Sequence, residues 1–143
     1  YKEKLLCIVS AINLVKLLTV ESQSNVNVFN LIGDLYSIFN IDDWVKEYIF
    51  WELKLLEIVG FNLQLNKIAK SEVINNEKKY FVGSNSEKKY IPNFLIDRHE
   101  EKLDNQTLSK ALKLVGDFLE KNVLKPNNIS YPNSRLEFVN LFK

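Results

Sequence analysis

Residues 50–65 carry three structural signals in one uninterrupted stretch, and these constrain the fold more than any other feature of the chain. Apolar residues at spacings of four and three form a stripe typical of a helix face turned toward a core: Trp51, Leu55 and Ile58. Gly60 follows that stripe, where helices often end in a residue with positive φ. Beyond it apolar and polar residues alternate, with the apolar positions at Phe61, Leu63 and Leu65. The stretch therefore predicts a packed helix, a glycine stop and an extended exit.

Similar stripes elsewhere predict a mainly α fold, a bundle of about five helices. The expected helices cover residues 4–20, 28–39, 40–59 and 107–123, followed by a short last helix from Ser134. The first segment is almost continuously apolar, but Asn13 and Lys16 interrupt it, and it is shorter than the roughly 20 residues of a membrane span. We therefore expect a helix that is buried on most sides within the bundle.

Two of these helices begin with residues suited to capping. Asn40 is the expected N-cap of the third helix, and Phe39 and Trp44 are placed to meet across that start. The sequence Ser134-Arg135-Leu136-Glu137 has the form of a capping box at the start of the last helix. From that start, three apolar residues are expected to face inward: Leu136, Val139 and Phe142.

Residues 66–92 change character and predict a small β-hairpin inserted between helices. Three short β-prone pieces are separated by turn residues: Val73-Ile74, Tyr80-Phe81-Val82 and Tyr90-Ile91. The lysine pairs Lys78-Lys79 and Lys88-Lys89 precede the last two pieces. Lysines beside aromatic residues can hold a nucleic-acid backbone and its bases. They can equally protect a solvated sheet edge, and the sequence leaves both interpretations open.

The composition fits one globular domain over residues 1–143, with 46% hydrophobic residues, 26% charged residues and a net charge of +1. Positive charge gathers in residues 64–92 and 110–143, each with six basic and three acidic side chains, which favours anionic partners. The chain begins with Tyr1 rather than methionine, which suggests a piece of a longer protein.

Catalytic and metal-binding motifs are absent from the sequence. The single cysteine, Cys7, lies in an apolar run, so we expect it to be buried in a protein of a reducing compartment. The single histidine, His99, lies in a charged connector and is expected at the surface. One cysteine and one histidine do not make a usual zinc site, and no phosphate loop or nucleophile elbow is present. The sequence therefore predicts no enzyme, no metal and no cofactor.

The order of these segments resembles the helical domain of the bacterial DNA repair protein RecO family. The resemblance rests on four pieces in sequence: the segment Phe50-Trp51-Glu52-Leu53-x-Leu55-Leu56, the segment Gly60-Phe61-x-Leu63-x-Leu65, a helix with Leu112, Leu114, Phe118, Leu119 and Val123, and a closing Ser134-Arg135-Leu136 helix. Two departures stand out. The family's N-terminal OB-fold is missing, and Ile68 and Ser71 stand where paired zinc-ribbon cysteines are expected. The inserted hairpin therefore resembles a degenerate, metal-free zinc ribbon.

The resemblance implies a non-catalytic mediator of DNA repair and recombination in the bacterial cytoplasm, at the nucleoid and not at a membrane. Proteins of this family bind single- and double-stranded DNA and anneal complementary strands. They dock to the acidic, partly apolar tail of the single-stranded-DNA-binding protein. With RecR they assist the loading of RecA.

Candidate contact residues follow from this implied role. For the DNA backbone we expect lysines, which carry no sequence preference: Lys78, Lys79, Lys88, Lys89, Lys67, Lys70, Lys121 and Lys125. For the protein tail we expect an apolar pocket with a basic rim, built from Phe50, Trp51, Lys54 and Arg135. Phe50 and Trp51 can also be ordinary core residues.

Two other functions remain open at this point. The chain could be a helical protein-interaction module whose lysine-bearing hairpin is only a solubilising surface. It could also be an enzyme that uses carboxylates, which a deep pocket with two close carboxylates would favour.

Overall fold

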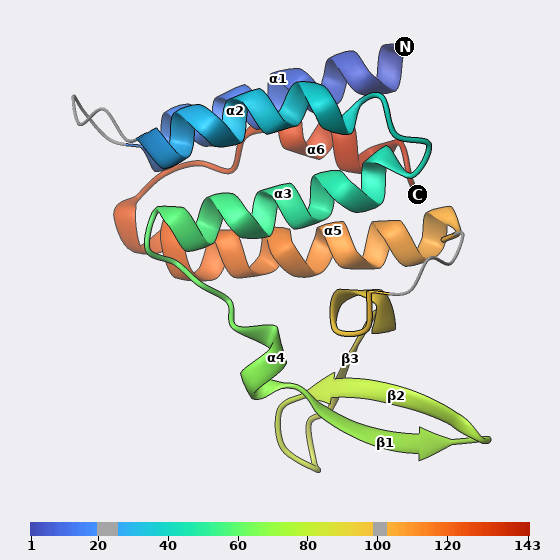
Figure 1. Ribbon diagram of the computed structural model, residues 1–143. Coiled ribbons are helices and arrows are strands. Elements are labelled where there is room, and N and C mark those ends of the chain that lie inside the picture. Colours follow the sequence, from blue (N-terminus) through green and yellow to red (C-terminus); the bar gives the residue numbers. More distant parts are fainter. Residues whose placement is uncertain (20–25, 99–102) are drawn as a thin grey trace.

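The computed structural model describes residues 1–19, 26–98 and 103–143 (Figure 1). The described part of the chain forms six α-helices: α1 (Lys2–Leu18), α2 (Val26–Ile38), α3 (Trp44–Ile58), α4 (Leu65–Ile68), α5 (Asn105–Leu119) and α6 (Asn133–Asn140). Its three strands are β1 (Lys70–Ile74), β2 (Glu77–Val82) and β3 (Lys89–Ile91). The remaining turns are the 3₁₀ segments η1 (Asn93–Leu95) and η3 (Lys125–Asn127) and the π-helical η2 (Glu120–Leu124), which extends α5. The prediction of a mainly α fold with an inserted β-element is confirmed.

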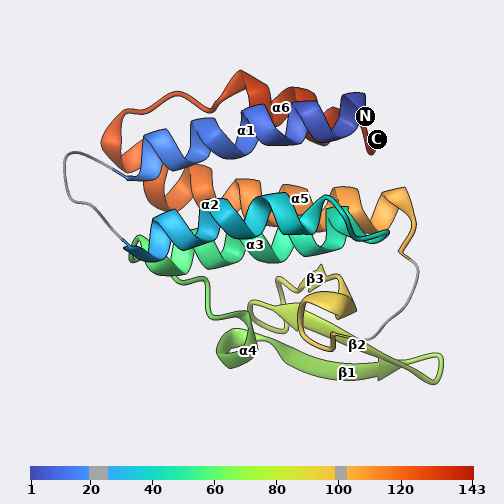
Figure 2. The same cartoon turned by 45° about the horizontal axis from the view of Figure 1, so that its top comes forward.

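The helices pack around one core, antiparallel in the pairs α1–α6, α2–α3 and α5–α6 and parallel in the pair α3–α5 (Figure 1). Helix α1 packs against α6, α2 against α3, and α3 against α5, while α6 also touches α5. The sheet lies beyond α3 and α5, on the opposite side of the bundle from α1 and α6 (Figures 1 and 2). It contacts the bundle through β3 and α5. Helices α3 and α5 therefore separate α1 and α6 from the β-element (Figure 1). No described helix is long and apolar enough to cross a membrane.

The glycine stop after α3 forms as the sequence predicts. Gly60 has a φ of 96°, which favours glycine over any other residue. Its amide donates to the carbonyl of Glu57 at 3.1 Å, and the amide of Phe61 donates to that of Leu56 at 2.7 Å. These two bonds make a Schellman motif, which satisfies the last helical carbonyls. The exit is extended as far as Gln64, whose φ of 52° turns the chain into α4.

The inserted element is a three-stranded antiparallel sheet in the order β1-β2-β3, one strand more than a simple hairpin. Asn75 and Asn76 both have positive φ, of 52° and 65°, and form the tight turn between β1 and β2. Ile74 faces Glu77 across this turn, and Tyr80 faces Ile91 in the second pairing. Tyr80 and Ile91 are buried, so this face of the sheet joins the core of the bundle.

The first helix is less buried than the sequence predicts. Leu5, Val9 and Ile12 are 54%, 43% and 42% exposed and form an open apolar stripe on α1. The prediction of burial on most sides is therefore wrong, because α1 packs only against α6 and, to a smaller extent, α3 among the larger helix contacts. Its inward face is narrow and made of small residues together with Cys7 and Leu14.

Both capping predictions are also wrong. Helix α3 begins at Trp44 with Asp43 before it, and Asn40 lies in the preceding turn. The expected contact between Phe39 and Trp44 does form, with ring centroids 5.6 Å apart. Helix α6 begins at Asn133 after Pro132, which has no side-chain acceptor and so cannot cap it. Ser134 lies inside the helix, and its hydroxyl accepts a hydrogen bond from Asn13 of α1 at 2.8 Å.

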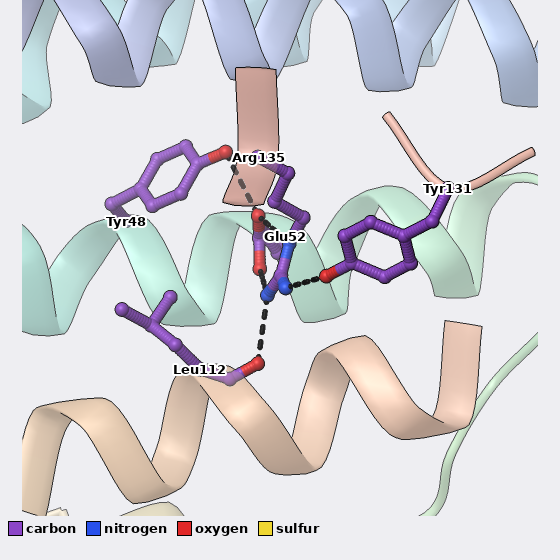
Figure 3. A network of polar contacts seen from close by, with 5 residues as sticks. All are labelled: Tyr48, Glu52, Leu112, Tyr131 and Arg135. Atoms are coloured by element: carbon purple, nitrogen blue, oxygen red, sulfur yellow. Dashed lines mark hydrogen bonds and ion pairs between the residues drawn. The ribbon is translucent and has the colours of Figure 1, made fainter. Parts of the chain in front are cut away.

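The predicted inward residues of the last helix are confirmed at Phe142, which is buried, and at Val139, which packs against the core, but not at Leu136. Leu136 is 46% exposed, whereas Arg135 and Phe138 are buried. Arg135 pairs with Glu52 of α3 through two hydrogen bonds, from Nε to Oε2 at 3.0 Å and from Nη2 to Oε1 at 2.7 Å. Its Nη2 also donates to the carbonyl of Leu112 in α5 at 2.9 Å (Figure 3). The guanidinium therefore ties α3, α5 and α6 together.

Two tyrosines complete this buried network. Tyr48 donates its hydroxyl to Glu52 at 2.9 Å, and the Tyr131 hydroxyl accepts from Nη1 of Arg135 (Figure 3). Burial disfavours the charged form of Arg135, but the attraction and hydrogen bonds of Glu52, with smaller contributions from the tyrosines, raise its pKa above the ordinary value. Burial, reinforced by the Glu52 charge, raises the pKa of Tyr48. The network thus keeps one buried ion pair between neutral neighbours.

We expect Arg135→Met to lower the free energy of unfolding by about 3–5 kcal/mol, because the Glu52 carboxylate would stay buried without its cation. Combining it with Glu52→Leu should recover much of this loss, since no lone charge then remains. Urea unfolding followed by circular dichroism measures both. The matched control is Lys79→Ala, which breaks the exposed pair with Glu77 (3.8 Å) and should cost under about 0.5 kcal/mol. An Arg135→Met loss as small as that of the control would contradict the structural role of the pair.

Gly116 of α5 lies directly against the network and should not tolerate a side chain. A Cβ built there would be 2.5 Å from Nη1 of Arg135 and 2.7 Å from the Tyr131 hydroxyl. We expect Gly116→Ala to destabilise the protein by about 1–3 kcal/mol, outweighing the better helix propensity of alanine. Gly33 of α2 has nothing within 4 Å of the same position, so Gly33→Ala should stabilise by about 0.5–1 kcal/mol. Equal melting-temperature shifts for the two variants would refute this explanation.

Candidate functional site

The four lysines predicted from the hairpin do not share one surface. Alternation along the strands puts Lys78 and Lys89 on the face that carries the buried Tyr80 and Ile91, toward the bundle. Lys79 points to the other face of the sheet with Phe81, and Lys88 covers the Phe81 ring at 4.7 Å. The lysine pairs therefore divide their charges between both faces of the sheet.

Most of these lysines already have an acidic partner. Lys88 lies 2.6 Å from Glu72, whose carboxylate also accepts the Tyr90 hydroxyl, and these hydrogen bonds lower the pKa of Glu72. Wider ion pairs hold three further lysines: Lys89 with Asp117 at 3.6 Å, Lys79 with Glu77 at 3.8 Å, and Lys125 with Glu120 at 3.9 Å. Lys78 lies over the Tyr80 ring at 5.2 Å. Such partners reduce the charge that an approaching phosphate meets.

Among the described residues, three of the predicted lysines have neither an acidic partner nor an aromatic ring against them. Lys67, Lys70 and Lys121 form no ion pair with any residue in the described ranges, and all three are exposed. Lys67 and Lys70 are close in sequence, at the end of α4 and the start of β1. Lys121 lies in the π-helical extension of α5. These three are the strongest remaining candidates for contacts with an anionic polymer.

A groove of about 310 Å³ lies where α3, the extended exit, α4 and η1 meet. Two of the predicted docking residues, Phe50 and Lys54, line it. Four leucines supply apolar lining: Leu53, Leu63, Leu65 and Leu95. Lys67 and Arg98 add two more cations, and Glu57, 3.9 Å from Lys54, is the one acidic residue among the described lining. The groove thus combines apolar surface with a net positive charge.

Arg98 is the groove residue that the sequence did not reveal. Its guanidinium carbon lies 4.0 Å from the centre of the Phe50 ring. Phe94 of η1 meets the same ring edge-on, at 5.9 Å and 86°. In sequence, Arg98 is one charged residue in a charged connector, 48 positions after Phe50. Only the return of the chain through the sheet and η1 brings it back to α3, and no local pattern signals that return.

The other two predicted docking residues lie elsewhere. Trp51 is 3% exposed, stacks on Tyr48 at 5.5 Å and donates its ring N–H to the Leu31 carbonyl at 2.7 Å. Arg135 is 1% exposed and pairs with Glu52 inside the bundle. The structure therefore brings Phe50 and Lys54 together at a groove and places Trp51 and Arg135 in the core.

The residues at the expected zinc-ribbon positions do not offer metal ligands. Ile68 and Ser71 occupy those positions, and both are exposed. Among the residues that the structure describes, no group of three or more histidine, cysteine or acidic side chains could hold a metal ion. Burial raises the pKa of the Cys7 thiol well above its usual range, which leaves it in its unreactive form. His99 lies outside the described residues.

Comparison with known proteins identifies relatives of the whole arrangement. The family model described as "Recombination protein O C terminal" matches residues 3–130. "DNA repair protein RecO" of Rhodospirillum centenum is 22% identical over 98% of this chain and 61% of its own length. The protein of the same name from Rhodospirillum rubrum is 30% identical over 67% of this chain and 43% of its own length. That of Bartonella henselae is 27% identical over 65% of this chain and 41% of its length.

The chain spans less than two thirds of the length of these curated relatives. No solved structure matches it. The family model nevertheless covers α1, the glycine stop, the sheet and α5 in order, including every residue of the groove. The chain therefore belongs to the RecO C-terminal domain family, a family of DNA repair and recombination proteins rather than of enzymes.

Proposed function

We propose that this chain acts as part of a RecO-type mediator of DNA repair and recombination. The observation that carries the proposal is the match of the RecO C-terminal family over residues 3–130. In this role the chain binds DNA, supports annealing of complementary strands, and docks the tail of the single-stranded-DNA-binding protein. Cooperation with RecR, and through it with RecA, belongs to the same proposal.

The exposed lysines support the DNA-binding part of this proposal. Lys67, Lys70 and Lys121 have no ion-pair partner in the described part of the chain, so each can release a counterion from a phosphate backbone. Lys79, Lys89 and Lys125 can contribute where phosphates displace the carboxylates 3.6–3.9 Å away. Lys78, Lys79 and Lys110 also line a second groove of about 920 Å³ beside β2 and α5. Contacts of this type carry no sequence preference.

The groove on α3 supports the docking part. An acidic protein tail with apolar side chains needs an apolar surface and nearby cations, and the leucine lining with Lys54, Lys67 and Arg98 supplies both. Trp51 and Arg135 support this docking indirectly, by holding α3 in place from the core.

A helical interaction module without nucleic-acid binding remains the second candidate. The observation in its favour is that Lys79, Lys88, Lys89 and Lys125 are paired with acidic residues. A carboxylate-based enzyme has no comparable support. Among the described residues, Glu57 is the sole acidic one lining the α3 groove, and the two that line the second groove are engaged, Glu77 with Lys79 and Asp97 with the Tyr80 hydroxyl.

We expect a triple variant, Lys67→Ala with Lys70→Ala and Lys121→Ala, to weaken binding of fluorescent single-stranded DNA. The slope of log affinity against log salt should fall by about 2, since each lost phosphate contact removes about 0.7. The matched control, Lys88→Ala with Lys89→Ala, removes two ion-paired lysines and should change the slope by less than about 1.

Fluorescence anisotropy at several salt concentrations measures these slopes. The four-lysine variant Lys78, Lys79, Lys88 and Lys89→Ala tests the hairpin as a whole. Wild-type protein that binds no DNA at any salt concentration would remove the DNA-binding part of the proposal and favour the interaction module.

We expect Lys54→Ala to weaken binding of a labelled single-stranded-DNA-binding protein tail peptide about 2–5-fold, because an exposed rim charge contributes up to about 1 kcal/mol. Lys113→Ala removes the same charge from an exposed position on α5 outside the groove and should leave the affinity unchanged. Isothermal titration calorimetry of the three proteins makes the comparison. Equal weakening by both variants would mean that the peptide responds to overall charge and not to the groove.

A further inference from the structure

Arg98 is held in a defined position at the α3 groove although its side chain is exposed. Its guanidinium lies 4.0 Å from the Phe50 ring centre, a distance at which cation–π attraction orients the group. The Phe50 ring is itself braced by the edge contact with Phe94, which is 5% exposed. The three side chains form a stack that starts in the core and ends at the groove.

The charge of Arg98 is available to a ligand. No carboxylate in the described ranges forms an ion pair with it. Its neighbour Asp97 accepts the Tyr80 hydroxyl at 2.6 Å instead. By contrast, Lys54 lies 3.9 Å from Glu57. Among the groove cations, Arg98 therefore combines a fixed orientation with a charge that no described carboxylate pairs.

The lining of the groove favours a peptide over a nucleic acid. Its leucines match aliphatic or aromatic side chains of a peptide, whereas the amides of Asn62, Gln64 and Asn66 can hydrogen-bond a peptide or a base alike. The aromatic ring at the groove, Phe50, is already covered by a guanidinium on its face and by Phe94 at its edge, so a base cannot stack there without displacing Arg98. A volume of about 310 Å³ accommodates one or two large side chains.

We propose that Arg98 is the residue that captures a carboxylate of an acidic, apolar-anchored peptide in this groove, by a two-pronged hydrogen-bonded pair. Phe50 is the positioning residue that presents the guanidinium, and the leucines take the apolar anchor. Guanidinium groups match carboxylates in this bidentate geometry, whereas a lysine ammonium offers only a point charge. This inference rests on the docking part of the proposed function.

The test measures binding of the labelled tail peptide, and of the same peptide with its acidic side chains and its C-terminal carboxylate replaced by amides, to the intact chain and its variants. Arg98→Ala should weaken acidic-peptide binding about tenfold or more. Arg98→Lys should keep only part of the wild-type affinity, because an ammonium cannot form the two-pronged pair with a carboxylate. Binding of the amide peptide should be unaffected by either variant. Arg98 is exposed, so these substitutions do not threaten folding.

Phe50→Leu separates positioning from direct contact. If Phe50 acts through Arg98, Phe50→Leu weakens acidic-peptide binding in the wild-type background and has no further effect beside Arg98→Ala. An equal loss in both backgrounds would overturn the positioning role. Unchanged affinity of Arg98→Ala, with Lys54→Ala still weaker than wild type, would overturn the role of Arg98 and leave the docking proposal intact. Wild-type protein that binds DNA but no peptide would overturn both this inference and the docking part.

Discussion

The buried pair of Glu52 and Arg135 is the interaction on which the rest of the structure depends. It joins residues 83 positions apart and reaches the backbone of α5 as well, so the three helices around it share one guanidinium. Desolvating two charges is costly, and such a pair contributes little net stability compared with apolar residues of the same size. The pair instead selects one packing of α6 against α3, because any other rotation of α6 leaves Glu52 buried without its cation. We interpret it as the contact that fixes the register of α6 against α3.

Fixing α3 also fixes the groove. The inward side of this helix carries Tyr48, Trp51 and Glu52, and its other side presents Phe50, Leu53 and Lys54 to the groove. The Schellman turn at Gly60 then directs the chain along the groove, so that Leu63 and Leu65 complete the lining. One helix therefore serves as the centre of the core and as a wall of the proposed docking site, and residues 50–65 supply eight of the twelve described lining residues.

Local signals explain which parts of the fold could be predicted. The glycine stop, the β-prone pieces and the stripe of α5 each depend on residues within a few positions of one another. The errors involve distant partners. Arg135 faces inward because it pairs with Glu52, and the apolar spacing therefore placed Leu136 wrongly inside while it placed Phe142 correctly. Arg98 reaches the groove only through the path of the sheet, and the apolar run of α1 does not reveal that few helices cover it.

The distribution of free charge links the two proposed ligands. The candidate lysines are not equivalent. Three lysines of the sheet region already have an acidic partner, which is Glu72, Glu77 or Asp117. Of the lysines left without a partner in the described part, Lys67 lines the α3 groove and Lys70 follows it within the next turn of chain. A phosphate backbone and an acidic peptide both require such a cation, and one ammonium cannot neutralise both at close range. In the proposed role, DNA and the protein tail therefore meet at adjoining surfaces that share Lys67, which makes the occupancy of one dependent on that of the other.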